Sequence, residues 1–251
     1  MSDAMSAEFN TVAEWTAKVA VDLGSAYRIP AACRGSGSPA ALDWLINQLA
    51  LSSGETLLDC GAGVGGPAGY AVKQRSVRPV LMEPEAGACR AARRLFGYPV
   101  VQAVASAVPF GDQSFDAAWS LGVLCTTSLQ LELLSELRRV VRAPGRIGLL
   151  VMVAATPVLD EQPDGNHFPT KQSLVDLVEK ADLRIEAWDD TTGMRPPPQG
   201  WQRRDETVNE ALSARHGHEP AWQVAKRQSK IISRLIADSQ LSTELLVLLS
   251  S

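Results

Sequence analysis

The stretch from residue 56 to residue 70 constrains the fold of this chain more than any other. Residues 56–58 form a short apolar run, which is typical of a buried parallel strand. Asp59 stands at its end, and Gly61 and Gly63 then belong to a glycine-rich turn. Because glycine has no Cβ, such a turn can bring backbone N–H groups close to a ligand. The stretch therefore predicts a strand that leads through a ligand-binding turn into a helix.

Two classes of ligand fit this turn. Gly61, Gly63 and Gly66 satisfy the G-x-G-x-x-G pattern of dinucleotide-binding proteins, which also occurs in many unrelated loops. Asp59 favours a different ligand, because a carboxylate here would repel a pyrophosphate and attract an ammonium group. S-adenosylmethionine carries such an ammonium. An NAD-binding oxidoreductase is the less favoured alternative.

The acid followed by the glycine-rich loop resembles motif I of the class I S-adenosylmethionine-dependent methyltransferases. Cys60 and Ala62 are ordinary variations within that motif. The resemblance covers roughly residues 38–189 and the last expected strand, and it implies S-adenosylmethionine as the cofactor. The residues of this motif that it places against the cofactor are Asp59, Gly61, Ala62 and Gly63.

A second acid supports a nucleoside ligand. Glu83 lies 22 residues after Gly61, at the end of an expected strand over residues 79–82, and Pro84 follows it. This spacing is close to the ~20 residues expected for an acid that accepts hydrogen bonds from ribose hydroxyls. We therefore expect Glu83 and Pro84 to contact the cofactor; the alternative is an exposed acid in a turn.

The expected adenine site departs from the family pattern. Residues 108–116 resemble the family's turn into the fourth strand. Many members carry an aspartate four residues before that turn, to accept a hydrogen bond from the adenine amino group, and this chain has Val104 there. We therefore expect adenine to be held by shape and by backbone groups near Ala105 and Ser106, with weaker affinity.

Three further residues are candidates for cofactor contacts. Ser120 ends the strand expected over residues 115–120 and Leu121 follows it, and the carboxyl end of this strand faces the ligand crevice in a doubly wound sheet. Arg34 lies in an expected loop of small residues, 27–37, that could close over the site and bring the guanidinium to the cofactor's carboxylate. An exposed loop arginine is the alternative.

Strands that alternate with helices predict a parallel α/β sheet, and the resemblance implies a Rossmann-like, seven-stranded, mostly parallel sheet with an antiparallel last strand. We expect helices on both faces and a helical cap over the carboxyl edge. The expected strands are 56–59, 79–82, 99–103, 115–120, 146–153, 184–189 and 244–249. The expected helices lie within 6–23, 38–49, 67–73, 89–96 and 131–141, after Thr170, and in two segments of 201–236. We expect a single domain, 1–251, with its core at 38–192 and 243–250 and its cap at 1–37 and 193–242.

Composition limits the possible partners. The chain has 251 residues and a net charge of −4, so a general electrostatic attraction to nucleic acid or to an anionic membrane is not expected. No apolar run approaches the ~20 residues of a membrane span, and the N-terminus lacks a signal-peptide pattern. A cytoplasmic location follows by default. The four cysteines are widely spaced, and no metal site is expected.

We expect direct methyl transfer from S-adenosylmethionine to a small-molecule acceptor. Trp15, Trp201 and Trp222 fall in the expected cap, so the acceptor pocket could be apolar or aromatic; for any one tryptophan, the favoured alternative is that it is only part of the cap core. His167, in the loop after the fifth strand, is a weak candidate for a general base. A non-catalytic cofactor sensor or partner protein is the main alternative. Both a monomer and a homodimer fit the sequence.

Overall fold

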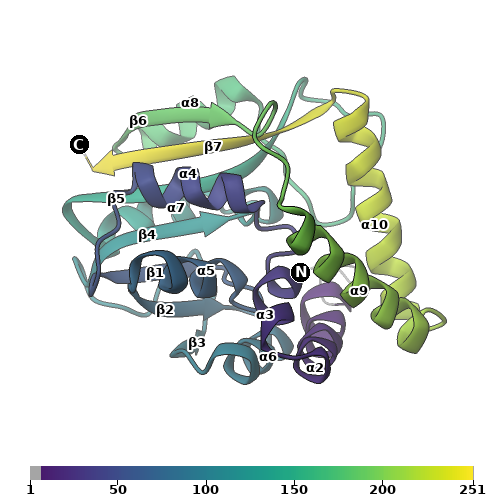
Figure 1. Cartoon of the computed structure of the whole chain (residues 1–251). Coiled ribbons are helices and arrows are strands. Elements are labelled where there is room, and N and C mark those ends of the chain that lie inside the picture. Colours follow the sequence, from purple (N-terminus) through teal and green to yellow (C-terminus); the bar gives the residue numbers. More distant parts are fainter. Residues whose placement is uncertain (1–6, 251) are drawn as a thin grey trace.

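The computed structural model describes residues 7–250 of the chain. A seven-stranded sheet has the order β3-β2-β1-β4-β5-β7-β6, and helices cover both of its faces (Figure 1). All neighbouring strands are parallel except β7, which runs antiparallel to both β5 and β6. The predicted Rossmann-like α/β fold with an antiparallel last strand is confirmed.

The strands lie close to the predicted ranges. Their bounds are β1 Thr56–Cys60, β2 Arg78–Glu83, β3 Val100–Gln102, β4 Phe115–Leu121, β5 Val141–Ala154, β6 Leu183–Asp190 and β7 Leu241–Ser250. The largest difference is β5, which extends further toward its amino-terminal end than predicted.

The helices follow the predicted order, with two additions, α3 and the short 3-10 helix η2. Their bounds are η1 Ala7–Val12, α2 Ala13–Leu23, α3 Ser25–Ala32, α4 Pro39–Gln48, α5 Gly66–Arg75, α6 Ala86–Phe96, η2 Leu124–Thr126, α7 Gln130–Val140, α8 Lys171–Lys180, α9 Gln199–His216 and α10 Pro220–Ala237. Ser6, the predicted start of the first helix, lies outside the described residues. The predicted loop over 27–37 was wrong in its first half, because α3 continues through Pro30 to Ala32.

Local signals explain several helix ends. The Ser38 side chain accepts a hydrogen bond from the backbone N–H of Ala41, and Pro39 occupies the first turn of α4, as predicted. Gly24 ends α2 with a φ of 110°, which only glycine adopts readily. Thr170 caps α8 in the same way as Ser38 caps α4.

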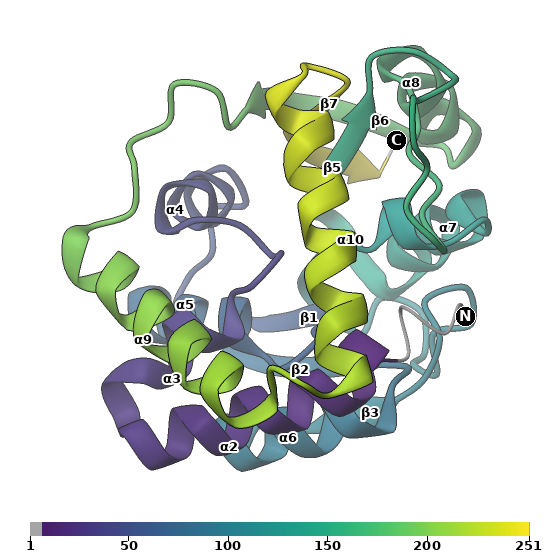
Figure 2. The same cartoon turned by 90° about the vertical axis from the view of Figure 1, so that its right-hand side faces the viewer.

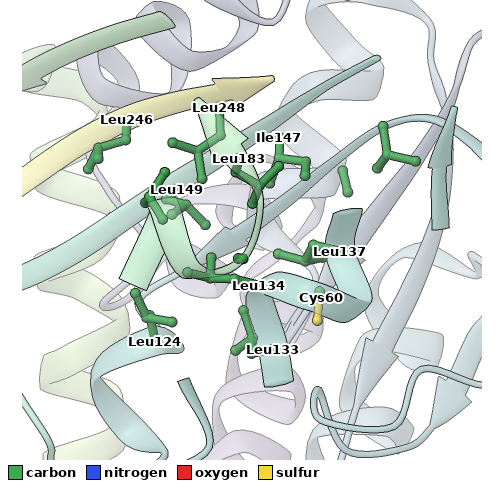
Figure 3. Close-up of a cluster of buried hydrophobic side chains, with 14 of the residues drawn as sticks. Cys60, Leu124, Leu133, Leu134, Leu137, Ile147, Leu149, Leu183, Leu246 and Leu248 are labelled. Carbon is green, nitrogen blue, oxygen red and sulfur yellow. The ribbon is translucent and has the colours of Figure 1, made fainter. Parts of the chain in front are cut away.

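The two faces of the sheet bury separate clusters. Leu57 of β1 packs with α4 and α5 on one face. Leu58, the next residue, packs with α7 and α8 on the other face. Figure 3 shows this second cluster, in which Leu133, Leu134 and Leu137 of α7 lie against leucines of β5 and β7. Because neighbouring residues of one strand point to opposite faces, β1 is buried on both sides.

A third layer of helices lies across the carboxyl ends of the parallel strands. Helices α2, α3 and α9 and the first half of α10 share a buried cluster that includes Val208, Leu212 and Trp222 (Figure 2). The second half of α10 packs against the ends of β5 and β7 through Leu235. The strand order reverses between β1 and β4, so this layer covers the point where doubly wound sheets bind ligands. Within 7–250, no helix combines the length and apolarity required to cross a membrane.

Candidate functional site

The turn after β1 has a geometry that depends on glycine. Gly61 adopts a φ of 78°, and a Cβ at this position would overlap the side chain of Val123. The backbone N–H groups of Gly61 and Ala62 both donate to the carbonyl of Met82, at 2.8 and 3.0 Å. These two hydrogen bonds hold the turn against the end of β2, where Glu83 follows Met82.

Asp59 is a buried acid with one unpaired carboxylate oxygen. Its side chain is 1% exposed, and its Oδ2 atom is buried with no hydrogen bond from the described residues. Burial raises the pKa of Asp59 to about 7, and the charge of Glu83 adds to the rise. The N–H groups of Trp119 and Ala68 favour the charged form and oppose this rise. A buried carboxylate oxygen that lacks a partner is costly, so this position favours a cationic ligand group close by.

Glu83 is also buried, but its carboxyl group is partly satisfied. Oε2 accepts a hydrogen bond from the N–H of Gly63 at 2.9 Å, and Oε1 accepts one from the N–H of Glu85 at 3.1 Å. Burial raises the pKa of Glu83 to about 7, although these two hydrogen bonds oppose the shift. Glu83 therefore fixes the glycine turn and still presents acceptor oxygens to the cavity that it lines.

A cavity of about 230 Å³ lies where the carboxyl ends of the strands meet the covering helices. Its walls come from the turns after β1, β2 and β4, from η1 and α2, from the segment after α3, from the loop after β5 and from α10. Figure 2 shows α10 passing over the ends of β1 and β2, and η1 lies against α10. The cavity is therefore roofed by helices that are distant from its floor in the sequence.

The structure brings some predicted cofactor residues to this cavity and leaves others outside its lining. Those that line it are Arg34, Gly61, Gly63, Glu83, Pro84 and Leu121. Those that do not are Asp59, Ala62, Ala105, Ser106 and Ser120. Asp59 and Ala62 are within two residues of Gly61 in the sequence, but both are buried, so they are not part of the cavity surface.

Ser120 and the expected adenine segment have other contacts. The Ser120 hydroxyl is buried and donates to the carbonyl of Cys60 at 3.0 Å, so it links β4 to β1. Ala105 packs at the margin of the core cluster that contains Leu58. Val104 is 51% exposed, which is consistent with a segment at the outer edge of the site.

His167 is exposed, and its contacts are made by its backbone. Its N–H donates to the carbonyl of Cys125, and its own carbonyl accepts from the side chain of Gln130, both at 2.7 Å. His167 does not line the cavity. Its neighbour Asn166 is buried and does line it.

Arg34 lies between acidic and aromatic groups. Its guanidinium is 5.7 Å from the centre of the Trp222 ring, a cation–π arrangement. Burial raises the pKa of Glu8, and the charge of Arg34 acts against that shift. Arg34 also lines a second, more polar cavity next to Trp201 and Asp205.

Sequence reasoning predicted helices over this edge but did not identify the residues with which they line the cavity. Glu8, Phe9 and Val12 from the N-terminal helices and Gln228 from α10 all line the cavity. The helical periodicity of both segments was visible, but it does not show which side of a helix faces the sheet. Conversely, none of the three cap tryptophans lines this cavity. Trp15 stacks on His216, Trp201 lines the second cavity, and Trp222 is buried in the helical layer.

No cluster of three or more potential metal ligands occurs among residues 7–250. The donor set at this site consists instead of buried carboxyl groups and backbone N–H groups. Such a set suits an organic cation and hydroxyl groups.

Comparison with known proteins identifies the same region. Residues 58–149 match the family described as methyltransferase domain. This segment begins within β1 and ends within β5, so it contains the glycine turn and Glu83.

Solved structures share the fold at low sequence identity. The 4+2 cyclase SpnF has a TM-score of 0.66 and 19% identity, over 83% of this chain and 79% of that chain. A putative sarcosine dimethylglycine methyltransferase from Galdieria sulphuraria has a TM-score of 0.64 and 16% identity, over 84% and 85%. The geranyl diphosphate C-methyltransferase from Streptomyces coelicolor A3(2), in complex with Mg2+, geranyl diphosphate and S-adenosyl-L-homocysteine, has a TM-score of 0.59 and 15% identity, over 84% and 80%.

Proposed function

We propose that this chain, which belongs to the class I S-adenosylmethionine-dependent methyltransferases, binds its cofactor in the roofed cavity and transfers the methyl group to a small-molecule acceptor. The observation that carries the proposal is the pair of buried acids at the ends of β1 and β2. Asp59 leaves one carboxylate oxygen unpaired, and Glu83 presents its carboxyl group to the cavity.

The residues present fit S-adenosylmethionine. The negative charge of Asp59 favours the ammonium of the methionine part, and Glu83 can accept hydrogen bonds from the ribose hydroxyls. Gly61 and Gly63 leave the backbone open for close approach of the ligand. Arg34, which also lines the cavity, is the candidate partner for the methionine carboxylate.

Methyl transfer mainly requires the protein to position the cofactor and the acceptor. When bound, S-adenosylmethionine supplies a methyl group that its sulfonium charge has already activated. The turn after β1 and the end of β2 orient the ligand, and η1 and α10 cover the cavity and exclude water. A dedicated protein nucleophile is therefore not required. The exposed position of His167 lends no support to a role as general base.

The roof supports a small acceptor. A protein or nucleic acid chain needs an open groove at the transfer site, whereas here η1, α2 and α10 contribute to the walls around the cavity. In this proposal the segments 1–37 and 193–242 form the cap, and 38–192 with 243–250 form the core.

Calorimetric titration tests the cofactor part of the proposal. We expect S-adenosylmethionine and S-adenosylhomocysteine to bind, and NAD to bind much more weakly. Tight NAD binding with no response to either sulfur compound would overturn the proposal.

Incubation with methyl-labelled S-adenosylmethionine and a metabolite extract tests the transfer. We expect a labelled small molecule that is absent from a heat-inactivated control. Cofactor binding without labelled product from any extract would favour a sensor or partner protein instead.

A further inference from the structure

Gln228 is a buried polar side chain that the cofactor site does not use. It lies on α10, is 8% exposed and lines the roof of the cavity. Its Oε1 atom is buried and has no hydrogen-bond partner among the described residues. Native proteins seldom keep a buried amide oxygen unpaired, because its lost hydration is not replaced. The position therefore points to a ligand group that pairs with it.

A second buried amide reaches the same cavity from another element. Asn166, in the loop after β5, is 8% exposed and lines the cavity. Its backbone is fixed, since its N–H donates to Pro163 and its carbonyl accepts from Gln162. Its side-chain amide makes one long contact, 3.4 Å to the carbonyl of Asp164. Amide groups from α10 and from this loop thus line one space.

Apolar side chains make up much of the remaining lining of the cavity. Phe9 of η1, Val123 after β4, Met152 of β5 and Ile232 of α10 contribute to the walls. Ile232 lies one helical turn after Gln228, so both residues lie on the same side of α10. A ligand here would bury hydrocarbon surface and make a small number of hydrogen bonds.

The charges around the cavity argue against an anionic acceptor. Glu8, Glu83 and Glu85 line it, and Arg34 is the only lysine or arginine among the lining residues that the structure describes. The charge of Arg34 already acts on Glu8 and on Asp205. Residues 7–250 contain no metal-ligand cluster that could neutralise a phosphate group.

We propose that Gln228 is a specificity-determining residue that hydrogen-bonds to the acceptor, and that the acceptor is a mainly apolar molecule that bears a hydroxyl group and no negative charge. A hydroxyl both donates and accepts, so it can pair with the oxygen or the nitrogen of the Gln228 amide and of the Asn166 amide. This inference rests on the proposed function, because it assigns the part of the cavity beyond the cofactor residues to the acceptor.

The test uses four probes that share one fluorinated ring. They are 4-fluorobenzyl alcohol, 4-fluorotoluene, 4-fluorobenzylamine and 4-fluorobenzoate, each titrated by fluorine NMR with and without saturating S-adenosylhomocysteine. For the unaltered protein we expect the alcohol to bind about fivefold more tightly than the toluene, the effect of one net hydrogen bond. We expect the benzoate to bind most weakly.

Two matched variants locate the interaction. Gln228→Leu should remove the preference for the alcohol over the toluene and change toluene binding by less than about twofold. Gln223→Leu changes an exposed glutamine of the same helix and should keep the preference. Circular dichroism and thermal unfolding show whether each variant keeps the fold.

The outcomes are distinct. An unchanged alcohol preference in Gln228→Leu, a preference for benzoate or benzylamine, or no binding of any probe would each overturn the inference. Failure of the proposed function shows separately, as absence of S-adenosylhomocysteine binding in calorimetry on the same samples, because the probes are also titrated without it.

Discussion

Asp59 and Glu83 are buried carboxyl groups at the ends of the adjacent parallel strands β1 and β2, and the charge of Glu83 acts on Asp59. Burial is the main reason that the pKa of Asp59 rises to about 7, and the charge of Glu83 adds to the rise. Burial likewise raises the pKa of Glu83 to about 7. Two acids that ordinarily titrate near pH 4 thus change charge near neutral pH in the ligand-free fold.

The stability of the ligand-free protein should fall as pH rises from about 5 to about 7. In this range the native state holds protons on Asp59 and Glu83 that the unfolded chain, with pKa values of ~3.9 and ~4.3, has already lost. The unfolded state therefore binds fewer protons, and the free energy of unfolding decreases with pH. Urea denaturation at pH 5, 6, 7 and 8 measures this slope.

Asp59→Asn is the matched variant for that experiment. It removes one titrating group, so the slope between pH 5 and 6 should become shallower by up to ~1.4 kcal/mol per pH unit. Asp116→Asn serves as a control, because hydrogen bonds from Thr56 lower the pKa of Asp116 and its titration lies below this range. Equal slopes in Asp59→Asn and the unaltered protein would contradict the burial argument.

Two ligands separate the roles proposed for the acids. S-adenosylhomocysteine has both an ammonium and a ribose, whereas adenosine has the ribose alone. Glu83→Gln should weaken both ligands, by ~1–3 kcal/mol for a hydrogen bond to a charged group. Asp59→Asn should weaken S-adenosylhomocysteine by a similar amount and leave adenosine within about 0.5 kcal/mol.

Calorimetry with the two variants and the two ligands gives the comparison. The placement of the ammonium beside Asp59 is refuted if adenosine and S-adenosylhomocysteine lose equal affinity in Asp59→Asn. The assignment of the ribose to Glu83 is refuted if adenosine binding is the same in Glu83→Gln as in the unaltered protein.

The requirement for glycine at position 61 can be tested together with Val123, the side chain that a Cβ on Gly61 would overlap. Gly61→Ala forces a residue with a Cβ into a left-handed conformation, which costs roughly 1–2 kcal/mol, and also presses against Val123. We expect lower stability and weaker cofactor binding. Adding Val123→Ala should remove the overlap with the Val123 methyl groups and restore part of the loss, while the backbone strain remains. Urea denaturation of the single and double variants, with Val123→Ala alone as the control, measures both parts. The same stability for Gly61→Ala and its double variant would show that the overlap is not the cause.

The residues on the floor of the site could be predicted from the sequence, whereas for the roof only the presence of covering helices could be predicted. Asp59, Gly61 and Glu83 lie at ends of parallel strands, and the carboxyl ends of such strands meet at one edge whatever the loops do. Gln228 reaches the cavity only because α10 packs against η1 and β7, which are long-range contacts. Periodicity gives the apolar side of a helix but not the partner it meets.

The missed helix α3 has a related cause. Pro30 lies inside it, and proline within a short stretch of small residues favours a loop by local propensity. Helix α3 is kept by its packing against α2, α5 and α9, and Ala31 and Ala32 are buried. Arg34 follows α3 by two residues, so the packing of α3 also positions Arg34 in the cavity wall. Tertiary contacts of α3 thus overrode the local preference for a loop at Pro30, in the segment that precedes Arg34.

The N-terminal part of the roof depends on a contact between Asn10 and Gly87. The N–H of Gly87, in α6, donates to Oδ1 of Asn10 at 2.6 Å, and a Cβ on Gly87 would overlap the backbone carbonyl of Asn10. Gly87→Ala should therefore displace η1, which carries Glu8 and Phe9 of the cavity wall. We expect faster hydrogen exchange at residues 7–12 and cofactor binding weakened by ~1–2 kcal/mol, the cost of one hydrogen bond and part of a wall.

Gly200→Ala is the matched control, because Gly200 lies in α9 and a Cβ there would meet only the end of the Arg204 side chain. Gly200 is the second residue of α9, where the preference for alanine is weaker than in a helix interior, so this variant should change stability by less than ~0.5 kcal/mol and keep its cofactor affinity. Asn10→Ala removes the hydrogen bond without adding bulk and should fall between the two in exchange rate. Unchanged exchange at 7–12 in Gly87→Ala would mean that η1 is held by its contacts with α10 rather than by α6. Faster exchange with unchanged affinity would instead remove η1 from the cofactor site.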